Sequence, residues 1–312
     1  MALEAGFRKF DTAEADYWHN QKSVGRALEE YFKYPVIEER ECAAALIQNF
    51  ADESDTCSLP KDLPKCGEED VRVSTKIPPW SMTSFEDIRQ HARDSRTELV
   101  GFCDDPNDNS TIYPLDVYYI HAPECWESWH PRCKDSLPDL LNLTEAWKAM
   151  EAIVAIDHSA QRIGVSNVHS YVLEDLIKDI KERQKQGDPN ARMPDVLQYF
   201  ADPIQPSSDE RAICSKYGIE FVAYSTLGRN HPDKSKENHV LSDPIVQGIA
   251  AKHGRSEAEV VLSWALQHKM SVIPRSKTKE HIEQLANMLT DDPTFLDDED
   301  GMAMNEMAYT IL

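Results

Sequence analysis

The sequence predicts an α/β fold built on a parallel β-sheet, and two patterns lead to that prediction. Short runs of β-branched and aromatic residues alternate along the chain with longer segments of helical period, an order typical of α/β folds. Most of the short runs are continuously apolar, as expected when helices cover both faces of a parallel sheet. Seven such runs with crossovers between them favour a TIM-type (β/α)8 barrel over an open doubly wound sheet.

The predicted strands and helices follow directly from this alternation. The seven runs predicted as strands are Phe7–Thr12, Val71–Lys76, Leu115–His121, Ile163–Ser166, Val196–Phe200, Phe221–Ser225 and Val272–Pro274. Four segments between them carry an apolar stripe at helical spacing, namely Ser23–Phe32, Thr144–Ile156, Pro244–His253 and Glu257–His268. Thr144 is the candidate N-cap of its helix.

Two stretches interrupt the alternation. Tyr34–Asp70 is long and acidic in its second half, which contains SDTCSLPKDLPKCGEED, so we expect an exposed insertion there. Asp291–Asp300, with the sequence DDPTFLDDED, is expected to be an acidic connector to a C-terminal tail. Neither stretch is low in complexity, and we see no linker between domains.

The charge balance excludes two classes of partner. Acidic residues outnumber basic ones 55 to 33, which gives a formal net charge of −22. A chain this acidic repels phosphate backbones and anionic lipid surfaces, so neither nucleic acid nor a membrane is an expected partner. Hydrophobic residues make up 41% of the chain, enough to fill a core and to exclude general disorder.

Targeting signals and cysteine usage point to the cytoplasm. No apolar run approaches the length of a bilayer span, and the N-terminus lacks the pattern of a signal peptide. The seven cysteines include no C-x-x-C pair, so we expect reduced thiols in a cytoplasmic protein, with no disulfide framework and no metal site.

Polar side chains stand at or near the carboxyl ends of the predicted strands. In a (β/α)8 barrel these ends open onto one face, which carries the active site. Any one of these residues alone is explained by helix capping or by a hydrogen bond in the core, but seven together predict a site. They are Asp11, Lys76, His121, Ser166 with Asn167, Gln198, Tyr224 with Ser225, and Arg275 with Ser276.

Several motifs in a fixed order resemble those of a known family. The chain is similar to the aldo-keto reductases, NAD(P)H-dependent carbonyl reductases built on a (β/α)8 barrel, from Ala5 to about Ala286. The segments that carry the resemblance are AGFRKFDTAEADYWHNQKSVGRAL, LDVYYIHAP, LTEAWKAMEAIV, RIGVSN, IEFVAYSTLG and DPIVQGIAAKHGRSEAEVVLSWALQHKMSVIPRSKTKEHIEQ. The resemblance therefore implies a barrel over residues 1–289, interrupted by the insertion at 34–70 and followed by a connector and tail at 290–312.

The resemblance implies four catalytic residues, Asp11, Tyr17, Lys76 and His121. Tyr17 would be the general acid, with its pKa lowered by the Lys76 ammonium. Asp11 would hold Lys76, and neutral His121 would orient the substrate carbonyl. One feature departs from the family pattern, because Tyr17 lies six residues after Asp11 and Asp16 occupies the position five after it.

The resemblance also implies NADP(H) as the cofactor, with NAD(H) as the alternative. Arg275, Ser276 and Thr278 would meet a 2′-phosphate, but His281 replaces the second arginine that the family uses there. Gln284 would contact adenine, and Leu285 replaces an expected Asn. The remaining cofactor residues would be Ser166, Asn167 and Gln198 at the carboxamide, Tyr224 stacked on the nicotinamide, and Ser225, Leu227 and Gly228 along the pyrophosphate.

Two functions follow from the resemblance. The first is an NADP(H)-dependent oxidoreductase that reduces a small aldehyde or ketone by hydride transfer, with Trp126 and Trp129 walling the substrate pocket and a monomer favoured. The alternative is a catalytically impaired barrel that acts as a nucleotide-sensing or protein-binding regulatory subunit. The shifted Tyr17 and His281 favour the alternative, as does an apparent lack of the N-terminal hairpin and first strand with which the family opens.

Overall fold

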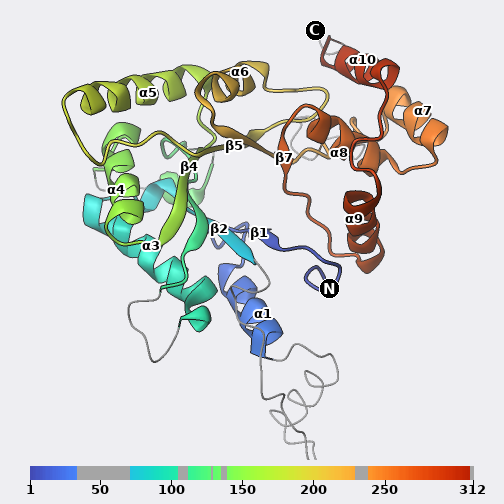
Figure 1. Ribbon diagram of the computed structural model, residues 1–312. Coiled ribbons are helices and arrows are strands. Elements are labelled where there is room, and N and C mark those ends of the chain that lie inside the picture. Colours follow the sequence, from blue (N-terminus) through green and yellow to red (C-terminus); the bar gives the residue numbers. More distant parts are fainter. Residues whose placement is uncertain (34–70, 105–111, 128, 135–138, 229–237, 310–312) are drawn as a thin grey trace, which may run out of the picture. The chain divides into compact units, whose positions relative to one another are not determined.

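Strands and helices alternate in the computed structural model, as the sequence predicts, and the strands follow one another in chain order from β1 to β7 (Figure 1). The structure describes residues 1–33, 71–104, 112–127, 129–134, 139–228 and 238–309. The predicted insertion at 34–70 lies outside the described residues. Every strand pair whose register is defined is parallel, namely β1 with β2, β4 with β5, β5 with β6 and β6 with β7.

The strands are β1 (Lys9–Asp11), β2 (Arg72–Ile77), β3 (Leu115–Ile120), β4 (Ala160–Ser166), β5 (Val196–Phe200), β6 (Glu220–Tyr224) and β7 (Ser271–Val272). The helices are α1 (Gln21–Lys33), α3 (Phe85–Val100), α4 (Leu143–Ala155), α5 (Ser170–Lys185), α6 (Ser208–Tyr217), α7 (Pro244–His253), α8 (Glu257–Gln267), α9 (Lys279–Asp291) and α10 (Asp298–Glu306). All seven predicted strands are confirmed, and the bounds of β5 and α7 agree with the prediction to the residue.

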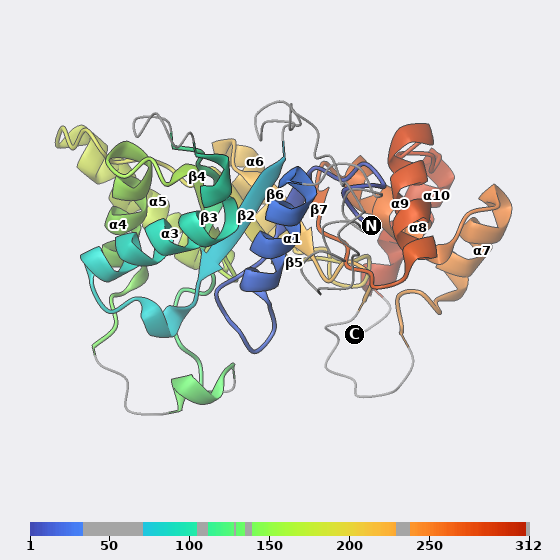
Figure 2. The same ribbon diagram turned by 90° about the horizontal axis from the view of Figure 1, so that it is seen from below.

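The chain divides into two compact units. The N-terminal unit comprises residues 8–119 and 126–162, and the C-terminal unit comprises residues 1–7, 120–125 and 163–312. In the N-terminal unit, α3 packs against both α1 and α4 (Figure 2). Gly25 permits the close approach of α1 to α3, because a Cβ atom there would collide with the carbonyl oxygen of Glu98. The core of this unit includes Ile88, Leu99 and Trp147, all fully buried.

The N-cap of α4 is Asn142, and the prediction of Thr144 is wrong. The Asn142 side chain accepts a hydrogen bond from the Glu145 N–H at 3.0 Å, and the Glu145 carboxylate accepts one from the Asn142 N–H. This reciprocal capping box satisfies two donors that the first turn of a helix leaves open. The helix therefore begins at Leu143, one residue before Thr144.

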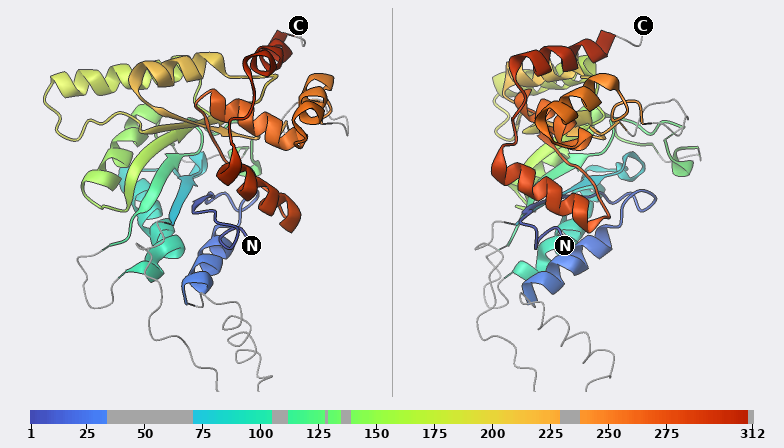
Figure 3. Two further views of the ribbon diagram at one scale, coloured as in Figure 1. Left: turned by 45° about the vertical axis from the view of Figure 1, so that its right-hand side comes forward. Right: turned by 90° about the vertical axis from the view of Figure 1, so that its right-hand side faces the viewer.

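The C-terminal unit contains helices α5 to α10 and strands β5, β6 and β7 (Figure 3). Ser256 and Glu259 form a second capping box at the start of α8, whose Trp264 is buried in the core. The predicted connector Asp291–Asp300 includes the last residue of α9 and the first turn of α10, which Asp297 caps. An acidic first turn is favourable because the N-terminus of a helix carries positive partial charge.

The cysteines do not all match the expectation of reduced thiols. Cys103, Cys125 and Cys133 are disulfide-bonded, whereas Cys214 is a free thiol buried in α6. Among the described helices, none combines the length and the apolar character that crossing a membrane requires.

Candidate active site

A buried ion pair joins the first two strands of the N-terminal unit. The Lys76 ammonium donates to the Asp11 carboxylate and, at 2.7 Å, to the carbonyl oxygen of Thr12. The Lys76 side chain is 2% exposed and that of Asp11 is 13% exposed. Because β1 and β2 run in parallel with Asp11 opposite Ser74, the last residue of β1 lies two residues along from Lys76 on the neighbouring strand. A charge this deeply buried requires such a partner, since desolvation is otherwise very costly.

The structure does not bring Tyr17 to this ion pair. Its side chain is 69% exposed, and its ring makes edge contacts with Trp18 at 5.3 Å and His130 at 5.5 Å between centroids. In the described part of the chain, no hydrogen bond joins the Tyr17 hydroxyl to Lys76. Asp16 is also exposed and lies 3.8 Å from Arg132. The chain thus has one residue more between Asp11 and Tyr17 than the family pattern, and in this structure the Tyr17 side chain faces outward.

Aromatic rings from three loops of the N-terminal unit gather around His130. Trp80 stacks on His130 with centroids 4.3 Å apart, and Trp18 lies 5.3 Å from Trp129. The predicted pocket residues Trp126 and Trp129 meet edge to face at 6.1 Å. These contacts supply an apolar surface in the same unit as Lys76. The prediction did not include Trp18, Trp80 or His130, although Trp18 and Trp80 closely follow the predicted first and second strands.

The C-terminal unit brings together residues from the ends of β3, β4, β5 and β6. The Tyr224 hydroxyl donates to the Asn167 side chain at 2.7 Å. The Asn167 amide group donates to the carbonyl oxygen of His121 at 2.8 Å, and its backbone N–H donates to the carbonyl oxygen of Gln198 at 3.2 Å. Ser166 and Gln198 are buried beside it. Burial raises the pKa of Tyr224 to about 12, so its phenol stays neutral near pH 7.

The segment after β6 has a fixed backbone. Ser225 has a φ of 54° and Gly228 a φ of 80°. A Cβ atom on Gly228 would lie 2.6 Å from the Asn238 side-chain oxygen, and the Asn238 amide donates to the carbonyl oxygen of Leu227 at 2.7 Å. Both the left-handed φ and the close approach require glycine at position 228.

These residues fit a nicotinamide cofactor by their chemistry. Ser166, Asn167 and Gln198 provide the hydroxyl and amide groups that can pair with a carboxamide. The buried hydroxyl of Thr226, in the segment predicted to follow the pyrophosphate, has no hydrogen-bond partner among the described residues. An orphan buried donor is unusual in a folded protein, and a phosphate group is a strong acceptor.

The residues predicted to contact the adenosine end lie around the start of α9. The Ser276 hydroxyl accepts from the Thr278 N–H at 3.1 Å, whereas Arg275, Thr278 and His281 are exposed. Gln284 is already engaged, because its amide donates to Ser256 at 2.9 Å and to Glu259 at 2.8 Å. In this structure Gln284 therefore supports the N-cap of α8, a role that spacing alone does not reveal.

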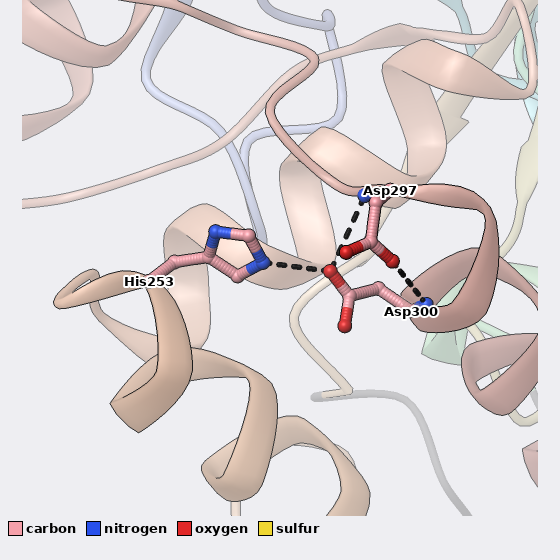
Figure 4. Close-up of side chains that lie close together, drawn as sticks. All are labelled: His253, Asp297 and Asp300. Carbon is pink, nitrogen blue, oxygen red and sulfur yellow. Dashed lines mark hydrogen bonds and ion pairs between the residues drawn. The ribbon is translucent and has the colours of Figure 1, made fainter.

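A separate charged cluster joins α7 to α10. His253 Nε2 lies 2.6 Å from an Asp300 carboxylate oxygen, and Asp297 lies beside them (Figure 4). The ligand atoms of these three residues lie within 4.8 Å of one another, as they would around a metal ion. However, the Lys252 ammonium donates to Asp297 at 2.7 Å and to Asp300 at 2.8 Å. The cluster is therefore an ion-pair network that connects the two helices.

We expect this network to make stability depend on pH in acid. The hydrogen bond from Lys252 lowers the pKa of Asp297 from 3.8 to about 2. Burial opposes ionisation of Asp300, but hydrogen bonds from Lys252 and His253 outweigh it, so that pKa is lowered as well. A carboxyl group whose pKa is lower in the folded than in the unfolded protein stabilises the fold at pH values above its unfolded pKa. This stabilisation is lost as the pH falls through its folded pKa. The contribution should therefore fade between about pH 4 and pH 2.

Asp297→Asn tests this expectation, since asparagine keeps the N-cap but removes the charge. The variant should melt at a lower temperature than the wild type at pH 7, and the difference should shrink towards pH 2. Asp298→Asn is the control, because it removes an exposed charge from the same helix end. Equal melting temperatures of Asp297→Asn and the wild type at pH 7 would contradict the expectation.

Comparisons with known proteins agree with this fold. The model of the Aldo/keto reductase family matches residues 1–300. Human aldo-keto reductase family 1 member A1 is 33% identical over 309 residues, which cover 96% of this chain and 77% of the human protein. The 9,11-endoperoxide prostaglandin H2 reductase of Trypanosoma cruzi is 26% identical over 92% of this chain and 74% of its own length.

Among solved structures, an aldose reductase from Giardia lamblia has a TM-score of 0.69 at 24% identity, covering 99% of this chain and 85% of that one. This likeness shows the fold. Together with the family match, it confirms the predicted α/β architecture of the (β/α)8 barrel type.

Proposed function

The chain belongs to the aldo-keto reductase family, and on that premise we propose that it reduces an aldehyde or ketone with NADP(H). The observation that carries the proposal is the buried ion pair of Lys76 and Asp11 at the ends of β1 and β2. A buried ammonium is a costly feature in a fold, and carbonyl reduction gives it a use because negative charge develops on the substrate oxygen.

The cofactor, when bound, supplies the hydride that reduces the carbonyl carbon. Ser166, Asn167 and Gln198 would hold its carboxamide, and Tyr224 would lie against the nicotinamide ring. The hydrogen bond from Tyr224 to Asn167 fixes both side chains before the cofactor arrives. Such preorganisation reduces the entropy lost on binding.

The proton delivered to the substrate oxygen is the second requirement. We assign it to Tyr17, with the Lys76 ammonium stabilising the phenolate that remains. This assignment requires the Tyr17 hydroxyl to approach Lys76 when substrate and cofactor bind. Among the described residues the Tyr17 ring makes edge contacts with Trp18 and His130, and most of its side chain is in solvent, so that part of it does not oppose the movement.

One observation favours the second candidate function. If Tyr17 stays where this structure places it, away from Lys76, the barrel binds the nucleotide without rapid reduction, and a regulatory role follows. Titration with NADPH followed by addition of an aromatic aldehyde separates the two candidates. Binding with turnover supports the reductase, and binding without turnover supports the regulatory barrel. Absence of binding contradicts the reductase and the nucleotide-sensing form of the regulatory barrel.

The preference for NADP(H) over NAD(H) gives a separate prediction. Restoring arginine at position 281 should tighten NADPH relative to NADH, because a charge-assisted hydrogen bond to a phosphate contributes about 1.5–3 kcal/mol. His281 is exposed, so solvent screening should keep the gain in binding free energy near the lower end of this range. That corresponds to about a tenfold gain in affinity for NADPH.

Dissociation constants for both nucleotides, measured by fluorescence on the wild type and on His281→Arg, test this preference. His281→Gln is the matched control, because it removes the imidazole without adding a guanidinium. An unchanged NADPH to NADH ratio in His281→Arg would place residue 281 away from the 2′-phosphate.

A further inference from the structure

We propose that Glu14 is a positioning residue for the Lys76 ammonium. Glu14 lies in the β1–α1 loop, defined here as residues 12–20, and it fastens that loop to strands and a helix whose positions are fixed by the core. The proposal deepens the proposed function and rests on it, since it assigns to Glu14 the placement of a group used in carbonyl reduction.

The Glu14 carboxylate accepts hydrogen bonds from three side chains. One oxygen accepts from the Tyr118 hydroxyl at 2.6 Å and from the Ser95 hydroxyl at 2.8 Å. The other oxygen lies 2.8 Å from Nδ1 of His91. The Glu14 side chain is only 10% exposed. A loop carboxylate this well buried and satisfied holds its backbone in one place.

The three partners belong to rigid elements of the N-terminal unit. Tyr118 lies in β3 and is fully buried, and His91 and Ser95 lie in α3 one turn apart. At the far end of the loop, Gln21 donates to the same Ser95 hydroxyl at 3.0 Å and to Glu98 at 2.8 Å. The β1–α1 loop is therefore anchored to α3 near both of its ends.

Glu14 is also connected to Lys76 through the backbone. Its N–H donates to the carbonyl oxygen of Lys76 at 3.1 Å. Two residues earlier, the Thr12 carbonyl oxygen accepts from the Lys76 ammonium, and Asp11 pairs with the same ammonium. Residues 11–14 thus contact Lys76 at both its backbone and its side chain, so a shift of Glu14 displaces the two acceptors that hold the ammonium.

The charges around Glu14 strengthen this arrangement. Burial and the Glu14 carboxylate raise the pKa of Tyr118 well above its usual value, so Tyr118 remains a donor. The hydrogen bond to Glu14 raises the pKa of His91, and the nearby Asp94 and Asp87 act in the same direction. Hydrogen bonds to an ionised carboxylate are roughly twice as strong as neutral ones.

Glu14→Ala and Glu14→Gln test the proposal in the full chain, with Asp16→Asn as the control that removes an exposed carboxylate from the same loop. Glu14→Ala should lower kcat by about 10²-fold, the cost of a displacement near 1 Å, and Glu14→Gln should lower it less. The KM and the dissociation constant for NADPH should stay within about twofold of the wild type, because the proposed function assigns Glu14 to neither ligand site. Asp16→Asn should keep the wild-type kcat.

A second variant separates positioning from folding. Glu14→Ala leaves the buried Tyr118 hydroxyl without its acceptor, which destabilises the fold, and Tyr118→Phe in the same chain removes that hydroxyl. The double variant should recover melting temperature but keep the low kcat. Recovery of kcat together with stability in the double variant would overturn the proposal. Wild-type kcat in both Glu14→Ala and Glu14→Gln would overturn it as well.

Hydrogen exchange of the substrate-free protein keeps this test independent of the reaction. Glu14→Ala should lose protection of the backbone amides of residues 12–16, whereas Asp16→Asn should not. If the wild type proves inactive, the proposed function fails while this measurement still decides whether Glu14 fixes the loop around Lys76. Unchanged protection in Glu14→Ala would overturn the positioning role even in an active enzyme.

Discussion

Replacing Lys76 by methionine is expected to lower kcat for aldehyde reduction by about 10²–10⁴-fold, the range that positioned acid–base chemistry contributes. Methionine has a similar length and fills the same space, so the loss isolates the charge. The Lys76 ammonium is within hydrogen-bonding reach of Asp11 and Thr12, which hold it at the end of β2. Lys9→Met is the control, because it removes an exposed lysine from β1.

The same substitution should also affect stability, since it leaves Asp11 without its counter-ion. Breaking a buried pair costs about 3–5 kcal/mol, and the 13% exposure of Asp11 places the expected loss near the lower end. Adding Asp11→Asn should recover most of the free energy of unfolding without recovering kcat. Denaturant unfolding and steady-state kinetics on the same preparations measure both effects. A fully active Lys76→Met variant would show that the ion pair takes no part in the reaction.

Tyr17→Phe is expected to abolish most of the reduction while leaving NADPH affinity unchanged. The phenol would donate its proton to the substrate oxygen, so its loss should cost about 10²-fold or more in kcat. The affinity for the nucleotide should be independent of this hydroxyl, because the phenol acts on the substrate oxygen and not on the cofactor.

Tyr171→Phe is a closely matched control for that experiment. Tyr171 is 66% exposed and stacks on His169 at 5.8 Å, while Tyr17 is 69% exposed and contacts His130 at 5.5 Å. Loss of turnover in Tyr17→Phe alone would show that the outward position seen here is not the reacting one. Wild-type turnover in both variants would show that another group delivers the proton.

The strands were predictable because most of them coincide with short runs of β-branched, aromatic or other apolar residues between segments of helical period. Strand β7 is the weakest case, since Ser271–Val272 is short and the predicted run began one residue later. Helix boundaries were harder, as α4 shows, because Asn142 and Thr144 are both good caps and only the Glu145 side chain selects between them. Helix α10 was not predicted, because the acidic residues of its first turn are typical of a loop.

The site was predictable where it depends on strand ends and not where it depends on loops. The family resemblance implied the pairing of Asp11 with Lys76, and the parallel register sets Asp11 opposite Ser74, two residues before Lys76. The position of Tyr17 depends on the path of the β1–α1 loop, and one added residue changes that path. The role of Glu14 arises from contacts with Tyr118, His91 and Ser95, which lie about 80 to 100 residues further along the chain and carry no sequence signal.

Transfer of a labelled hydride tests the central claim most directly. The wild-type chain is incubated with an aromatic aldehyde and NADPH that carries two deuterium atoms at the C4 position of the nicotinamide, and the product alcohol is analysed by mass spectrometry. The account predicts one deuterium on the carbinol carbon of the alcohol, formed by the wild type and at a much lower rate by Lys76→Met. Failure of the wild type to form labelled alcohol while it binds NADPH would contradict the account and identify a regulatory barrel.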